Sequence, residues 1–197
     1  MLKKIKDKIK KNAEKKKLIR IIDPHNKKSK RVVIKDFLKN DYKKIEKFAF
    51  KMLMLAVNAE KEKIFGNVYA VCHAQVTKKP LAFFILNTHN SKISSSFGSF
   101  LTKYGPIIIN PRIVPGKHSK KPNLVSEGSI SYPGREMANV ERYYKATFKF
   151  NYLVFDDKTN KVSGIKLGEV DLKGFYAQLL QHCIDQIDGK NIYKDKK

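Results

Sequence analysis

The stretch that most constrains the fold of this chain spans residues 174–189 and reads GFYAQLLQHCIDQIDG. It has no Pro, and no Gly between its two terminal Gly residues. Its apolar side chains recur at helical spacing, at Phe175, Leu179, Leu180, Cys183, Ile184 and Ile187. Gly189 suits the end of a helix, because the first residue past a helix often takes a left-handed conformation. The pattern therefore predicts an amphipathic helix over these residues.

Two polar residues of this helix have the spacing of metal ligands. His182 and Gln186 are four residues apart, so their side chains leave the same face of the helix, one turn apart. In the HExxH helix of metallohydrolases, two His residues at this spacing hold the metal and the Glu moves a proton. Here the five residues read HCIDQ, with Cys183 in place of the Glu and Gln186 in place of the second His.

The rest of the sequence predicts a single folded domain. A chain of 197 residues with 42% hydrophobic residues can build one core and is short for two. No run of 18 apolar residues is present, so no transmembrane helix is expected, and the Lys-rich start lacks the apolar part of a secretory signal. The two cysteines, Cys72 and Cys183, are too few for a disulfide framework and favour the cytoplasm.

The net charge of +24 has two explanations that the sequence leaves open. It would attract polyanions such as RNA, the ribosome or an anionic membrane surface. However, only five of the 42 basic residues are Arg, and an AT-rich genome would produce the same excess of Lys without any partner. Residues 1–17 are predicted to form a basic N-terminal arm, and residues 18–197 the folded domain.

The periodicity of the remaining segments indicates an α+β fold. A long helix is expected over residues 41–59, with Asp41 as its N-cap. Short apolar or alternating runs predict strands over residues 68–76, 81–86, 107–114, 144–155 and 165–172. The Ser-rich and Asn-rich residues 88–104 are expected to form a surface loop, and residues 117–123 a basic loop. The simplest packing places a long helix on antiparallel sheet.

Three motifs now follow one another in the order found in a known family. They are AVCHAQV at residues 70–76, EGSISYPG at residues 127–134 and QHCIDQIDG at residues 181–189. They resemble the GLAAxQ, EGCLSxPG and QHExDHLxG motifs of peptide deformylases, which remove the formyl group from the initiator Met of nascent chains. The resemblance extends over roughly residues 18–193 and implies that family's fold, with antiparallel sheets around the central motif helix.

The resemblance also implies a role for individual residues. In that family the Cys of the second motif and both His residues of the third bind Fe or Zn, and these positions are Ser129, His182 and Gln186 here. The Glu that acts as general acid and base corresponds to Cys183. Gln75 and the backbone N–H of Ile130 match the groups that hold the oxyanion. Glu127 and Arg142 match a charge pair that braces the loop, and Gly128 allows the backbone to pass closely.

These departures from the motifs lead to the expectation of no bound metal or other cofactor. A hydroxyl, one imidazole and an amide are weak ligands for a transition-metal ion. Without the metal and the Glu, the usual hydrolysis loses both its activated water and its base. We therefore expect a deformylase-like protein without standard activity. The alternative is a functional deformylase with an unusual ligand set that still holds Fe or Zn.

Cys183 itself has two interpretations. It could serve as a nucleophile, aided by His182 or by His73, which would share a strand face with Gln75 and look into the same pocket. More commonly such a Cys is buried and inert. The other histidines, His25, His89 and His118, lie in polar segments and are expected to be solvated.

The expected partners follow from the cleft and from the charge. A deformylase-like cleft could hold the N-terminus of a nascent peptide by strand addition, unless it is filled and only stabilises the fold. The basic arm and the Lys-rich loops could bind the ribosome or RNA. A further alternative is an RNA-binding or ribosome-binding protein that uses this fold with no peptide in its cleft.

Overall fold

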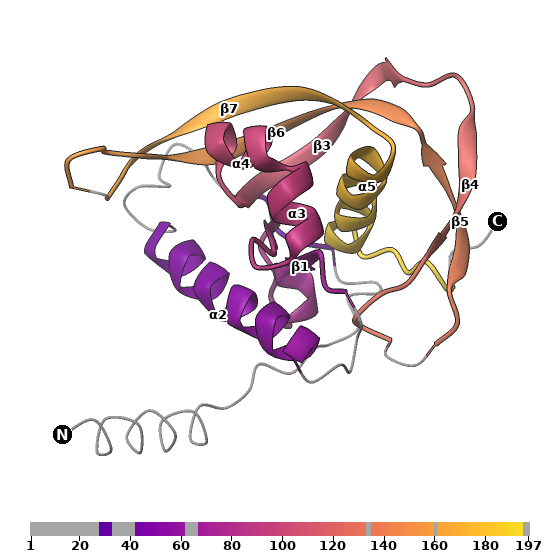
Figure 1. Cartoon of the computed structure of the whole chain (residues 1–197), viewed down its shortest axis with the longest axis horizontal. Coiled ribbons are helices and arrows are strands. Elements are labelled where there is room, and N and C mark those ends of the chain that lie inside the picture. The colour runs from indigo at the N-terminus through magenta and orange to yellow at the C-terminus, as the bar shows by residue number, and fades with distance from the viewer. Residues whose placement is uncertain (1–27, 33–41, 62–66, 133–134, 160, 195–197) are drawn as a thin grey trace.

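The computed structural model describes residues 28–32, 42–61, 67–132, 135–159 and 161–194 (Figure 1). The predicted basic arm, the N-cap Asp41 and His25 lie outside these residues. The described helices are α2 (Tyr42–Lys61), the 3-10 helix η2 (His73–Gln75), α3 (Ser91–Ser96), α4 (Gly98–Tyr104) and α5 (Phe175–Ile187). The strands are β1 (Ala70–Cys72), β2 (Phe83–Leu86), β3 (Ile107–His118), β4 (Pro122–Glu127), β5 (Ala138–Tyr143), β6 (Lys145–Phe155) and β7 (Val162–Lys173).

The strands of the described residues form two antiparallel sheets. The larger has the order β1-β2-β3-β6-β7, and β4 pairs only with β5 in the smaller one. The long β6–β7 hairpin spans the molecule, and the β4–β5 ribbon lies beside α5 (Figure 1). The α+β class and the antiparallel pairing are therefore as predicted.

The large sheet separates two apolar clusters, because neighbouring side chains on a strand point to opposite faces. On β2, Phe84 and Leu86 join the cluster around α3, α4 and α5. Phe83 and Ile85 join the cluster around α2. The sheet is thus covered by α5 on one face and by α2 on the other.

Helix α5 forms where the sequence predicted it. Leu180, Cys183 and Ile187 are buried against the sheet. The chain leaves the helix through Gly189 at a φ of 77°, a conformation that favours Gly. Gln181 also fixes β5 to this helix, because its Oε1 accepts from the Tyr143 N–H and its Nε2 donates to the Tyr143 carbonyl, both at 2.9 Å. None of the described helices is long and apolar enough to cross a membrane.

The expected loop over residues 88–104 is wrong, because this segment forms α3 and α4. The Asn90 side chain caps α3 by accepting from the N–H groups of Lys92 and Ile93. The buried side chains Ile93, Phe97, Phe100 and Tyr104 then follow one another at helical spacing. This stripe packs against β6 and α5, so the segment belongs to the core.

Three other features also differ from the prediction. The strand expected over residues 68–76 ends at Cys72, and the chain turns into η2. The basic loop expected over residues 117–123 is shorter, because β3 extends to His118 and β4 begins at Pro122. The β4–β5 ribbon was not predicted.

Candidate functional site

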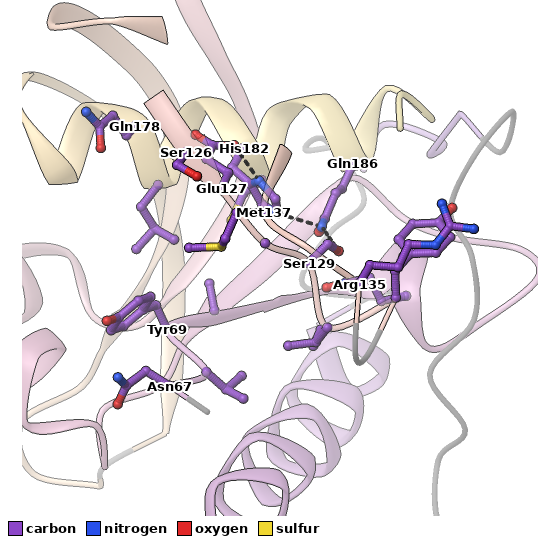
Figure 2. Close-up of a pocket in the computed structure, with 18 of the residues that line it drawn as sticks. Asn67, Tyr69, Ser126, Glu127, Ser129, Arg135, Met137, Gln178, His182 and Gln186 are labelled. Carbon is purple, nitrogen blue, oxygen red and sulfur yellow. Dashed lines mark hydrogen bonds and ion pairs between the residues drawn. The ribbon is translucent and has the colours of Figure 1, made fainter. Parts of the chain in front are cut away.

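A cavity of about 450 Å³ lies between α5, the start of β1 and the end of β4. Its lining includes the apolar residues Val68, Phe175 and Leu179. Figure 2 shows Tyr69 apart from the polar side chains of the second and third motifs, Ser129, His182 and Gln186. The volume falls in the range of small-ligand and peptide side-chain sites. The residues that line it are Asn67, Val68, Tyr69, Ala70, Gln75, Ser126, Glu127, Gly128, Ser129, Ile130, Tyr132, Arg135, Met137, Phe175, Gln178, Leu179, His182, Cys183, Gln186 and Tyr193.

The three positions that resemble metal ligands meet at the polar side of this cavity. The Gln186 Nε2 lies 2.8 Å from the His182 Nε2 and donates to the Ser129 Oγ at 3.1 Å (Figure 2). The Ser129 Oγ also accepts from the Ser131 N–H at 3.3 Å. The three side chains therefore satisfy one another through direct hydrogen bonds.

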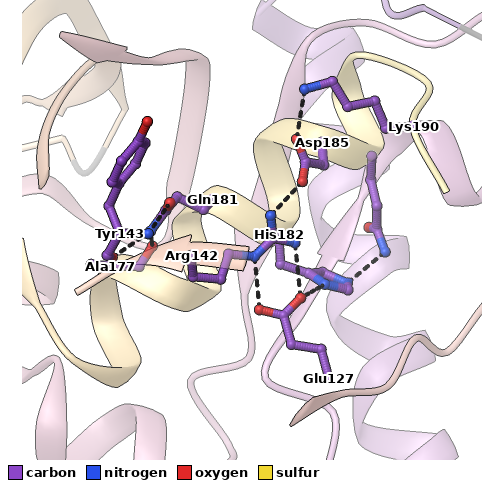
Figure 3. Close-up of polar contacts among 9 residues, drawn as sticks. Glu127, Arg142, Tyr143, Ala177, Gln181, His182, Asp185 and Lys190 are labelled. Carbon is purple, nitrogen blue, oxygen red and sulfur yellow. Dashed lines mark hydrogen bonds and ion pairs between the residues drawn. The ribbon is translucent and has the colours of Figure 1, made fainter. Parts of the chain in front are cut away.

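Glu127 fixes the orientation of His182. Its Oε2 lies 2.9 Å from the His182 Nδ1, so the tautomer with a proton on Nδ1 donates to the carboxylate (Figure 3). The His182 Nε2 is then an acceptor, which matches the Gln186 amide nitrogen that faces it. A hydrogen-bonded chain thus runs from Glu127 through His182 and Gln186 to Ser129.

Arg142 binds the same carboxylate from the other side. Its Nε and Nη2 donate to the two Glu127 oxygens at 2.8 and 2.9 Å, and its Nη1 donates to the Asp185 Oδ2 at 2.6 Å (Figure 3). Lys190 pairs with the other Asp185 oxygen at 3.1 Å. The Arg142 side chain is 6% exposed and that of Glu127 is 11% exposed, so the pair is held away from water.

Burial and pairing act in opposite directions on these charges. Burial would raise the pKa of Glu127, but the hydrogen bonds from His182 and Arg142 and the electrostatic attraction of these side chains outweigh it and lower the pKa to about 2. Burial would likewise lower the pKa of Arg142, and its contacts with Glu127 and Asp185 raise it instead. Glu127 and Arg142 therefore form a stable, charged brace behind His182.

The residues at the ligand positions do not fit a catalytic Fe or Zn ion. Such an ion needs about three strong donors, usually thiolate, imidazole or carboxylate, and this site offers one imidazole with a hydroxyl and an amide. The same three groups are already hydrogen-bonded to each other. Among the described residues, no group of three or more His, Cys, Asp or Glu side chains is arranged to hold a metal.

The remaining residues with implied roles are also near the cavity. Cys183 and Ile130 line it, and Cys183 is 1% exposed. The Gln75 Oε1 accepts from the Cys72 N–H at 2.8 Å, and its Nε2 donates to the Ser131 Oγ at 3.0 Å. Gln75 is therefore held in place by the motif loop. Gly128 faces Met137, whose sulfur would lie 3.2 Å from an added Cβ.

His73 does not share a face with Gln75, because both lie in η2 and not on a strand. Its ring is 1% exposed between Phe48 and Phe83, and its Nδ1 accepts from the Leu81 N–H at 2.9 Å. Since His73 does not line the cavity, it cannot assist Cys183 there.

The two other described histidines differ from each other. His89 is exposed, as predicted. His118 is half-buried and stacks on Tyr143 at a ring distance of 3.9 Å, so the prediction that it is solvated is wrong.

Sequence reasoning missed several residues of the site. Asp185 contributes to the brace, and it lies between the two recognisable positions of the helix motif. Arg135 stands at one end of the cavity, with its guanidinium 5.2 Å from the Tyr132 ring centre and 5.5 Å from that of Tyr193. An Arg close after the second motif was the available signal.

Comparisons with known proteins agree with this geometry. The family model for polypeptide deformylase matches residues 16–197. A comparison with curated protein sequences gives no match.

Solved deformylase structures share the fold. The peptide deformylase from Thermotoga maritima is 20% identical, with a TM-score of 0.61 over 89% of this chain and 95% of its own. The enzyme from Legionella pneumophila is 23% identical, with a TM-score of 0.61 over 91% of this chain and 86% of its own. That from Plasmodium falciparum is 19% identical, with a TM-score of 0.61 over 90% and 86% of the two chains. With its motifs in order and the family model matched over most of its length, the chain belongs to the polypeptide deformylase family.

Proposed function

We propose that this protein binds the N-termini of peptide chains in its cavity and does not hydrolyse them. The observation that carries the proposal is the contrast within the site. The cavity stays open at about 450 Å³, while the side chains at the ligand positions are bonded to each other. Binding depends on the cavity, whereas metal-assisted hydrolysis depends on the ligands.

Two sheet edges border the cavity and suit an extended peptide. β1 is the edge strand of the large sheet, and β4 is an edge of the two-stranded sheet. Residues at the start of β1 and at the end of β4 both line the cavity. An extended peptide placed between them could add to either edge through its backbone.

The two sides of the cavity suit the two parts of a peptide N-terminus. Tyr69, Phe175 and Leu179 offer an apolar surface for a side chain such as Met. Ser129 and Gln186 offer polar groups for the terminal amide or amine. The expected ligand is thus a peptide that begins with Met, with or without a formyl group.

No group in the cavity is positioned to replace the missing chemistry. The His182 Nε2 faces the Gln186 amide and not a hydroxyl or thiol, so no base contacts a nucleophile there. Cys183 is buried and follows His182 on a helix, where adjacent side chains diverge. We therefore place Cys183, Gln75 and Ile130 in the wall of a binding site.

Fluorescence anisotropy with labelled formyl-Met and Met peptides tests this proposal. We expect saturable binding that is weakened at least tenfold by Phe175→Ala, a change in the cavity wall. Phe50→Ala is the matched control, because Phe50 is 62% exposed on α2, outside the residues that line the cavity. Absence of binding, or equal binding by both variants, would contradict the proposal, and so would release of formate with turnover.

A specific observation supports a second function, binding to RNA or the ribosome in the cytoplasm. One surface is formed by three segments, residues 28–31, 42–59 and 78–79. Leu81 brings them together, because it pairs with Lys30 in a β-bridge and packs in the apolar cluster of α2. Their described side chains include one acidic group, Glu46. They carry eight exposed cations, namely Lys28, Lys30, Arg31, Lys44, Lys47, Lys51, Lys78 and Lys79.

This basic surface is unlike the surface formed by β3, β6 and β7. There Lys117 and Lys149 pair with Glu169 at 3.1 and 3.0 Å, whereas none of the eight cations makes an ion pair within the described residues. The uneven distribution favours a polyanion partner over a mere excess of Lys.

Salt dependence tests the second function. If about five phosphates of single-stranded RNA are neutralised, the logarithm of the affinity should fall with that of salt at a slope of roughly −3.5. Changing Lys44, Lys47 and Lys51 together to Gln should lower this slope by about 2. The control changes Lys158, Lys161 and Lys166, which are exposed near the β6–β7 turn. A slope that responds equally to both triple variants would assign the effect to net charge alone.

A further inference from the structure

The two cysteines of the chain meet inside the protein, although they are 111 residues apart in sequence. Cys72 ends β1 and Cys183 lies in the middle of α5. The Cys72 Sγ donates to the Cys183 carbonyl oxygen at 3.7 Å, and the Cys183 side chain is close enough to act on the pKa of the Cys72 thiol. Both residues are 1% exposed, and both are free thiols in this structure.

The two thiols differ in their position relative to the cavity. Cys183 is among the residues that line the cavity, whereas Cys72 is not. Burial, with a further contribution from the contact with Cys183, raises the pKa of Cys72 well above its ordinary value. Cys72 therefore stays protonated and is poorly suited to react first.

The peptide-binding proposal places Cys183 in the cavity wall and requires no chemistry from either thiol. Cys183 stands where the family motif has its Glu, and Cys72 stands where the first motif has Ala. Two changes at separate motifs have thus placed the only two cysteines of the chain in contact at one wall of the cavity. A buried Cys needs no partner thiol, so packing alone does not require this pairing.

We propose that Cys72 and Cys183 form an oxidation site, at which hydrogen peroxide or an organic hydroperoxide joins them in an intramolecular disulfide. The Cys183 thiol loses its proton and attacks a peroxide oxygen. The O–O bond breaks, the leaving oxygen takes up the proton, and Cys183 becomes a sulfenic acid.

The second step closes the bond. The Cys72 sulfur attacks the Cys183 sulfur, the S–O bond breaks, and the hydroxide that leaves takes the proton from Cys72 to form water. In total the two thiols lose two protons and two electrons, and hydrogen peroxide is reduced to two molecules of water.

The disulfide would act on the elements that carry the polar side of the cavity. It would fix the end of β1, which leads into Gln75, to the turn of α5 that carries His182 and Gln186. The formation of the bond is independent of the peptide-binding proposal. Its effect on peptide affinity rests on that proposal.

Mass spectrometry of the intact full-length protein tests the oxidation site. After treatment with hydrogen peroxide under native conditions, we expect a monomer whose mass is lower by two hydrogen atoms. After denaturation, neither cysteine of this monomer should react with maleimide. Proteolysis should give one linked peptide pair containing Cys72 and Cys183, and dithiothreitol should restore both thiols. Because the chain has two cysteines, no other intramolecular disulfide can form.

Two variants separate the roles of the thiols. In Cys72→Ser, dimedone should trap a sulfenic acid on Cys183, because the second thiol is missing. In Cys183→Ser, Cys72 should remain unmodified at the same peroxide concentration. If one of these variants does not fold, the measurement on the wild-type protein still tests the oxidation site.

Several results would overturn the proposal. The first is that the wild-type protein keeps both thiols under these conditions. The second is that sulfinic acid accumulates on Cys183 and no linked peptide pair is found. The third is that only disulfide-linked dimers form. Peptide anisotropy on the oxidised monomer is read separately. An intact disulfide with unchanged peptide affinity keeps the oxidation site and removes its effect on binding.

Discussion

Replacing Glu127 with Gln should destabilise the protein by about 3 kcal/mol at pH 7. The pKa of Glu127 falls from 4.5 to about 2 in the folded protein. At about 1.36 kcal/mol per pKa unit, this shift corresponds to roughly 3 kcal/mol of stabilisation by the ionised carboxylate. Removal of one partner from a buried ion pair costs a similar ~3–5 kcal/mol. We expect the lower end, because Asp185 would still pair with Arg142.

The sign of the pH dependence follows from the lowered pKa. The carboxylate stabilises the folded state above pH 4.5, and this contribution is lost as the pH falls from 4.5 toward 2. The wild-type protein should therefore lose about 3 kcal/mol over this interval through Glu127, and the Glu127→Gln variant should not.

Urea unfolding followed by circular dichroism at pH 7 and pH 3 measures both effects. Glu169→Gln is the control, because Glu169 is 39% exposed and pairs with Lys117 and Lys149 at the surface. Such exposed pairs contribute only about 0–1 kcal/mol. If Glu127→Gln loses less than about 1 kcal/mol at pH 7, or keeps the acid sensitivity of the wild type, the brace does not stabilise the fold as described.

Three further predictions concern His73, Gln181 and the ligand positions. Burial, with the charge of Lys44, lowers the pKa of His73 from 6.5 to about 4. The folded protein should therefore lose about 3 kcal/mol of stability as the pH falls from 6.5 to 4. Thermal unfolding of the His73→Asn variant should not show this loss. Gln181→Ala should lower the free energy of unfolding by about 1–3 kcal/mol, because the Tyr143 N–H and carbonyl lose their partner; a change below about 0.5 kcal/mol in urea unfolding would contradict this. Changing Ser129 to Cys, Cys183 to Glu and Gln186 to His together should create a site for about one Zn per chain, whereas Ser129→Cys alone should not. Equal zinc content of the two variants by atomic emission would refute the argument that the wild-type residues are too weak as ligands.

The helix and the hairpin could be predicted because their patterns are local. The periodicity of α5 and its terminal Gly residues lie within one segment, and the alternation of Phe148, Phe150 and Tyr152 on β6 needs no distant partner. Helices α3 and α4 were missed because their Ser-rich composition concealed the spacing of the buried Ile93 and Phe97.

The contacts within the site could not be predicted from the motifs, because they depend on the tertiary structure. The sequence placed His182 and Gln186 on one helix face but could not indicate that an amide and a hydroxyl would bond in place of ligands to a metal. Asp185 was not recognised because Arg142, its partner, lies 43 residues earlier on β5. The contact of Cys72 with Cys183 likewise exists only after β1 packs on α5.

The most direct test of the central claim is the metal content of the wild-type protein. The chain should be purified without oxygen and supplied with Fe(II) or Zn(II), and metal should be measured together with formate release from a formyl-Met peptide. The hydrogen bonds between Ser129, His182 and Gln186 predict metal well below one ion per chain and no formate above the blank. About one ion per chain with continuous formate release would contradict the claim and establish a working deformylase with an unusual ligand set.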